Sequence, residues 1–164
     1  MIRRALLAAA LLAPAAFAPL PSFAQYAAAS GPQAELPKEK LVIVTADGVA
    51  HPFNVEMAVT PGEQTTGLMF RPTVPADGGM LFDWGQPRDS AMWMRNTVAS
   101  LDMLFINPDG SIRHIAENTT PESMAIIPSG GDVRATLELA AGTAARLNIR
   151  VGDHVQQRVF GNAS

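Results

Sequence analysis

Side chains that could do chemistry gather in one short stretch near the middle of this sequence. Trp93, Asn96, Thr97 and Asp102 follow one another there, and Arg71 lies a little upstream. A flat indole ring beside amide, hydroxyl and charged groups is a common way to hold a small polar ligand. These five residues are therefore the predicted ligand-binding set. A saccharide is one ligand that they would suit, stacked on Trp93 or on Trp84.

Each of these residues also has an ordinary structural role that the sequence leaves open. Asn96 and Thr97 follow an expected strand, and such side chains commonly cap a turn by bonding to nearby backbone groups. Arg71 and Asp102 could form a buried ion pair that joins two loops.

Two other kinds of chemistry compete with ligand binding. Asp102 and Glu138 could be the acid and base of a hydrolase acting on an envelope glycan, provided that the fold brings them together. Met92 and Met94 would share one face of a strand and present two soft thioethers to Cu(I). Methionine at apolar strand positions is also ordinary core filling.

The composition removes several other function classes from the prediction. The chain has no cysteine, which excludes thiolate nucleophiles and thiolate metal sites. Its three histidines, at positions 51, 114 and 154, are isolated, and neither a phosphate-binding glycine loop nor a G-x-S-x-G motif is present. We therefore expect no cofactor and favour a non-enzymatic role. The net charge of −3 and the lack of a Lys/Arg run argue against nucleic-acid binding.

The first 24 residues have the composition of a secretory signal peptide. Arg3 and Arg4 precede the apolar run Ala5–Ala13, prolines then interrupt it, and small residues lead up to Ala24. We expect cleavage near Ala24 and a periplasmic or secreted protein with no stable membrane span after cleavage. A protein of the cell envelope is then an alternative partner to a small ligand.

The rest of the chain is predicted to form one β-rich domain over residues 41–161, after a flexible leader over residues 25–40. Apolar and polar residues alternate with period two in several runs that are separated by turn signals. The fold class is mainly β, a jelly-roll-like sandwich or barrel of about eight short strands with one or two short helices. The expected strands are 41–45, 53–57, 79–84, 90–95, 101–107, 111–117, 133–139 and 154–160.

The clearest helix signal follows the second expected strand. Thr60 and Glu63 have the spacing of a capping box, Pro61 occupies the first helical position, and Gly67 is a natural end. These residues predict a helix of about two turns. A second short helix is expected over residues 142–147.

Several motifs together resemble the DUF192 (UPF0127) family, over about residues 53–155. They are Gly67-Leu68-Met69 with Arg71, Gly79-Met80-Leu81-Phe82, Met92-Trp93-Met94-Arg95-Asn96-Thr97, Leu101-Asp102, Leu137-Glu138-Leu139, Gly142 and Gly152-Asp153. The resemblance implies a compact jelly-roll-like or barrel-like fold and no established catalytic mechanism. Arg95 stands where the family usually has Lys, and Ser100 where it usually has Pro, which leaves the approach to Asp102 less rigid.

Overall fold

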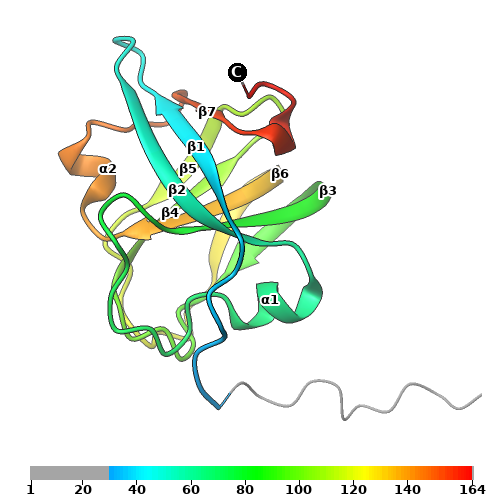
Figure 1. Ribbon diagram of the computed structural model, residues 1–164, viewed down its shortest axis with the longest axis vertical. Helices are drawn as coiled ribbons and strands as arrows, with labels where there is room; N and C mark the ends of the chain where they lie inside the picture. Colours follow the sequence, from blue (N-terminus) through cyan, green and yellow to red (C-terminus); the bar gives the residue numbers. More distant parts are fainter. Residues whose placement is uncertain (1–29, 164) are drawn as a thin grey trace, which may run out of the picture.

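The computed structural model describes residues 30–163 (Figure 1). The expected signal peptide, 1–24, and the leader up to residue 29 lie outside the described residues. Among residues 30–163, no helix combines the length and the apolar character needed to cross a bilayer.

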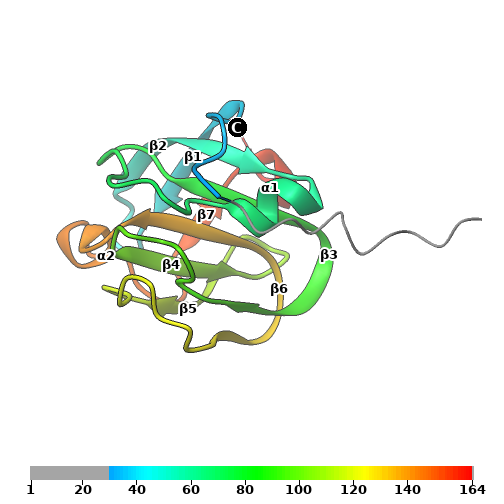
Figure 2. The same ribbon diagram turned by 90° about the horizontal axis from the view of Figure 1, so that it is seen from below.

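Seven strands within the described residues form a single sheet that curls into a nearly closed barrel (Figures 1 and 2). The strands are β1 (Lys38–Val44), β2 (Ala50–Ala58), β3 (Met80–Met92), β4 (Leu101–Ile106), β5 (Ile112–Ala116), β6 (Ile127–Ala140) and β7 (His154–Gln156). Their order in the sheet is β5-β4-β6-β3-β2-β1-β7; β2 and β3 pair in parallel, and the other neighbours are antiparallel. A bridge between Ser111 and His154 links the two outer strands and almost closes the ring. The mainly β prediction is confirmed.

The apolar side chains form two clusters on opposite faces of this sheet. All seven strands contribute to the interior cluster, which fills the barrel and includes Leu41, Leu104 and Leu137. The outer cluster lies on the other face and includes Met80 and Phe82 of β3, Met103 of β4 and Val133 of β6. Every residue of β4 is buried, because this strand is covered on both faces.

The helix α1 (Pro61–Thr66) lies over the outer face and forms as the capping signal predicts. Thr60 Oγ1 accepts a hydrogen bond from the Glu63 amide at 3.3 Å, and Glu63 Oε2 accepts one from the Thr60 amide at 2.8 Å. Gly67 ends the helix with a φ of +49°, and a Cβ there would lie 3.0 Å from the ring of Phe82. Glycine thus permits the close approach of α1 to β3.

The structure differs from the sequence-based expectation at three places. Residues 80–84 and 90–92 of the runs expected as strands 79–84 and 90–95 belong to one long strand, β3, whose pairing with β6 shifts register twice. Residues 93–95, expected in the second of these strands, lie beyond the end of β3. Residues 158–160 form a short 3₁₀ helix instead of the end of a strand. β1 begins at Lys38, so the last three residues of the expected leader belong to the sheet. The second helix, α2 (Thr143–Arg146), is present within its expected range.

Candidate functional site

A buried carboxyl group on β6 is the most unusual feature of the outer face. Glu138 pairs with Met80 of β3 on one side and with Met103 of β4 on the other, so all three side chains point to the same face. Its exposed fraction is 4%, and no group in residues 30–163 donates a hydrogen bond to it. Burial alone raises the pKa of Glu138 to about 8.

Glu138 lines a cleft of about 380 Å³ on the outer face, which we name the tryptophan cleft. The segment 61–69 forms one wall, and β3 with the residues after it forms the other. Its lining side chains include Gln64, Met69, Phe82, Trp84, Arg88, Met92, Trp93, Thr97 and Glu138.

Specific contacts hold the walls of the tryptophan cleft in place. Gln64 Nε2 donates to the carbonyl oxygens of Ala58 (3.2 Å) and Asp83 (2.7 Å), which ties α1 to β2 and β3. Trp84 Nε1 donates to Thr136 Oγ1 at 3.2 Å, and the guanidinium of Arg88 lies 4.1 Å from the centre of the Trp84 ring. The cleft therefore has a fixed aromatic wall on one side.

The chemistry available in this cleft follows from its charges. Arg88 and Glu138 are the two ionisable side chains that line it. With its raised pKa, the Glu138 carboxyl is largely protonated at neutral pH, so it can donate one hydrogen bond and accept others. It can also release its proton to water when a positively charged ligand binds beside it. A polar group held without a partner in an accessible cleft is a typical mark of a binding site.

Asp102, predicted as a ligand-binding or catalytic residue, lies elsewhere. It is fully buried, and its carboxylate accepts hydrogen bonds from the backbone amides of Asn118 (2.9 Å), Gly142 (3.1 Å) and Ala144 (2.8 Å). Two of these amides belong to the N-terminal end of α2. Asp102 therefore fixes α2 and the chain after β5 against the barrel, and its acceptor positions are occupied.

The structure also separates the two carboxyl groups of the hydrolase hypothesis. Asp102 pairs in register with Leu139, whose side chain belongs to the interior cluster, whereas Glu138 pairs with Met103 of the outer cluster. Adjacent residues of a strand point to opposite faces. Asp102 and Glu138 therefore face opposite sides of the sheet and do not converge on one substrate.

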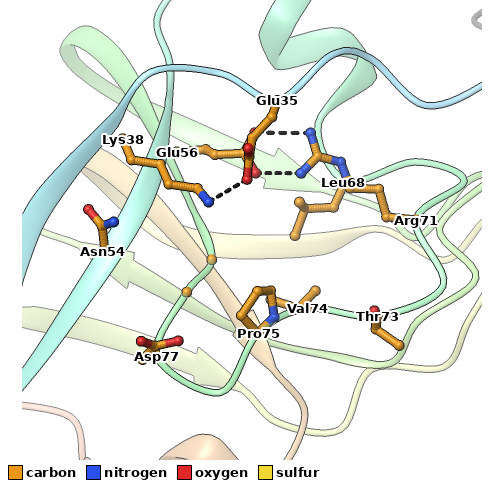
Figure 3. Close-up of a pocket in the computed structure, with 12 residues that line it drawn as sticks. Glu35, Lys38, Asn54, Glu56, Leu68, Arg71, Thr73, Val74, Pro75 and Asp77 are labelled. Atoms are coloured by element: carbon orange, nitrogen blue, oxygen red, sulfur yellow. Dashed lines mark hydrogen bonds and ion pairs between the residues drawn. The ribbon is translucent and has the colours of Figure 1, made fainter.

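Arg71 lines a second cleft, of about 420 Å³, and is paired with Glu56 (Figure 3). Its Nη1 bonds to Glu56 Oε1, and its Nη2 lies 2.9 Å from Glu56 Oε2. The amide of Leu36 also donates to Glu56 Oε2, at 2.8 Å. The ion pair therefore joins β2, the loop after α1 and the segment before β1. Arg71 forms the kind of joining pair that the sequence suggested, but with Glu56 in place of Asp102.

The remaining predicted ligand residues lie together, in the turn that follows β3. Trp93, 39% exposed, and Thr97 both line the tryptophan cleft. Asn96 has a φ of +55°, its carbonyl accepts from the Phe70 amide, and its side-chain amide lies 3.8 Å from the sulfur of Met69. The predicted set is thus divided: Trp93 and Thr97 line the cleft, Asn96 lies beside it, and Arg71 and Asp102 bind other parts of the protein.

The two methionines of the Cu(I) hypothesis are also divided. Met92, the last residue of β3, lines the tryptophan cleft. Met94 lies beyond the strand, is fully buried, and its sulfur is 3.2 Å from the hydroxyl of Thr119. Within the described part of the chain, no group of three or more His, Cys, Asp or Glu side chains could hold a metal ion.

Sequence reasoning missed Gln64, Met69 and Arg88 as lining residues, and it placed Glu138 with the wrong partner. The alternation along β6 does put Glu138 on the face opposite Leu137 and Leu139. The sequence signal that could have identified Glu138 as a site residue was a carboxylate in the middle of a strand whose two faces are both buried.

The fold and this cleft define a small β-barrel protein with a pocket on the outer face of its sheet. The chain belongs to the DUF192 family, described as "Uncharacterized ACR", whose model matches residues 42–157. The resemblance carried by the sequence motifs is thereby confirmed. A search of curated proteins found no match.

Two solved structures share both fold and sequence with this chain. One, from Sinorhizobium meliloti 1021, is described as a candidate transcription regulator; it is 46% identical, covers 77% of this chain and 98% of its own, and superposes with a TM-score of 0.75. The other, from Novosphingobium aromaticivorans DSM 12444, is a protein of unknown function; it is 35% identical, covers 85% of this chain and all of its own, and gives a TM-score of 0.73.

Proposed function

We propose that this protein is an exported binding domain without catalytic activity, whose small ligand occupies the tryptophan cleft. The ligand has an apolar face that lies against Trp84 or Trp93 and a polar group that reaches Glu138. A saccharide has both features and is the first class to test. The periplasmic location is part of this proposal and rests on the signal-peptide composition of residues 1–24.

The observation that carries the proposal is the state of Glu138. A carboxyl group that is nearly buried and that no protein group binds has a raised pKa and is available to a ligand that reaches it. Glu138 is 4% exposed, lacks a partner among residues 30–163, and lines a cleft open to solvent. A bound ligand would supply the missing hydrogen bonds.

The lining of the cleft favours binding over hydrolysis. A glycosidase needs two carboxyl groups on either side of the scissile bond. Glu138 is the one carboxyl group among the lining residues, and Asp102 faces the other side of the sheet. The remaining ionisable group, Arg88, lies against the ring of Trp84. No second acid or base therefore stands in position to activate water.

The description of the S. meliloti structure suggests a role in transcription, which we do not propose for this chain. DNA binding relies on the neutralisation of phosphates by clustered Lys and Arg side chains. This chain has 12 such residues against 15 Asp and Glu, and two of the 12 lie in the expected signal peptide.

Intrinsic fluorescence gives a direct test, because the chain has two tryptophans and both line the cleft. We expect glucose, N-acetylglucosamine or maltose to change the emission of the purified protein in a saturable way. At 100 times its dissociation constant, a specific ligand should also add about 2.7 kcal/mol of stability, or on the order of 5–15 °C in the unfolding midpoint.

Three variants locate the site. Glu138→Gln and Trp93→Ala should weaken binding, whereas Glu117→Gln, at an exposed carboxylate after β5, should leave it unchanged. Saturable binding that survives Trp93→Ala and Glu138→Gln would place the ligand outside the cleft. If neither sugars nor any other small molecule changed the emission or the midpoint, the proposal of a small-ligand site would fail, and an envelope protein would become the expected partner.

A further inference from the structure

Methionine is unevenly divided between the two apolar clusters of the described residues. The interior cluster has fifteen buried members, of which Met57 is the single methionine. The outer cluster has ten, and four of them are methionines: Met80, Met92, Met94 and Met103. Branched aliphatic side chains fill the barrel interior, so core packing in this protein does not by itself require methionine. The thioethers gather on the face that carries Glu138.

Two of these methionines flank the buried carboxyl group in the sheet, and two methionines line the cleft with it. Met80 and Met103 stand directly beside Glu138 on the neighbouring strands, and their side chains point to the same face. Met69 and Met92 line the cleft with it, with exposed fractions of 7% and 9%. The cleft therefore offers an ion two thioethers and a carboxyl group to which no other group of residues 30–163 donates a hydrogen bond.

We infer that the tryptophan cleft is also a site for a soft monovalent metal ion, Cu(I), held by the thioethers of Met69 and Met92 and by the Glu138 carboxylate. Thioether sulfur prefers Cu(I) to the harder divalent ions. The inference rests on the proposed function, because both place a ligand in this cleft, and it adds a second class of ligand.

The charges balance for a monovalent ion. Glu138 releases its proton to water as Cu(I) binds, the thioethers stay neutral, and the copper is neither oxidised nor reduced. One positive charge thus replaces another in a buried site, which avoids the cost of leaving an unpaired charge there. Arg88 is the other charged side chain in the lining, and α1 contributes the neutral Gln64 and Thr65. Because a ligating carboxylate must be deprotonated, the proton and the ion compete for Glu138.

The test is an anaerobic competition for Cu(I) between the purified protein and a chromophoric Cu(I) chelator, repeated with Ag(I), which does not change oxidation state. We expect one ion per chain. Met92→Leu and Glu138→Gln should each weaken binding by about tenfold or more. Met57→Leu is the matched control, because it makes the same change in the interior cluster and should leave the affinity unchanged. Thermal unfolding of each variant would verify that it is folded.

The outcomes separate this inference from the proposed function. If the chelator kept all the Cu(I) while a sugar still changed the tryptophan emission, the metal site would be wrong and the proposed function would stand. If neither ligand bound, both would fail. Equal losses in Met92→Leu and Met57→Leu, or an affinity that Glu138→Gln left unchanged, would also overturn the site, because either would show that the ion does not bind at these side chains.

Discussion

The ionisation of Glu138 should make the protein less stable as pH rises, and Glu138→Gln should remove that effect. The folded protein holds the pKa of this carboxyl at about 8, whereas its ordinary value is 4.5. Between these two values the folded state binds more protons than the unfolded state, so the free energy of unfolding falls as pH increases. The loss begins above the lower pKa and is complete above the higher one.

The size of the effect follows from the two pKa values. Each unit of difference corresponds to about 1.4 kcal/mol, so Glu138 lowers the free energy of unfolding by ~1 kcal/mol near pH 5 and by ~5 kcal/mol near pH 9. The expected change over this range is ~4 kcal/mol, which is an upper estimate because water can enter the cleft and solvate the carboxylate. Glutamine has nearly the same shape and does not ionise.

The measurement is urea unfolding of the wild type and of Glu138→Gln at several pH values from about 5 to about 9. Other titrating groups are common to both proteins, so the difference between the two free energies reports Glu138 alone. We expect the variant to gain stability relative to the wild type as pH rises. A difference that stayed constant over the range would refute the reasoning, because it would show that Glu138 ionises as an exposed or paired carboxyl does.

Three further substitutions test other parts of the structure. Asp102→Ala should lower the free energy of unfolding by roughly 3 kcal/mol or more in urea, because three backbone amides lose their acceptor. Arg71→Met should cost about 3–5 kcal/mol, because it leaves the buried Glu56 carboxylate unpaired, and adding Glu56→Gln should restore part of the loss. Gly79→Ala should lower the thermal midpoint by several degrees, since its Cβ would lie 2.3 Å from the Glu138 carbonyl oxygen. Gly62→Ala, with no atom within 4 Å of the added carbon, should not. A neutral result for Asp102→Ala or Arg71→Met would contradict the structural roles given to them.

Local signals in the sequence predicted the local structure well. The capping box at Thr60 and Glu63 produced both expected hydrogen bonds, because its partners are only three residues apart. The strands were harder to delimit. The turn-like residues near Gly85 suggested a break, but β3 continues past them because β6 pairs with it on both sides of a register shift. Such long-range pairing leaves little trace in a local pattern.

The candidate site was harder to predict than the fold, because side-chain type does not reveal which partner is nearby. Asp102 has the composition of a ligand-binding residue, yet backbone amides more than fifteen positions away occupy its oxygens. Glu138 was predicted as a candidate acid or base. Its lack of a hydrogen-bond partner, however, depends on the apolar side chains of Met80 and Met103, which flank it from the two neighbouring strands. The distinction between a satisfied and an unsatisfied carboxyl group appears only after folding.

The near closure of the barrel has a consequence for how this chain behaves among copies of itself. In an open sheet, β5 and β7 would be the two free edges, and unpaired edges recruit strands from other molecules. Here the amide of Ile112 donates to the Asp153 carbonyl, that of Gly152 donates to the Ile112 carbonyl, and that of Val155 donates to the Gly110 carbonyl. Backbone groups that could otherwise pair with another molecule and start aggregation are thus hydrogen-bonded within one molecule. The chain has no cysteine and can form no disulfide, so this closure protects it against aggregation in another way.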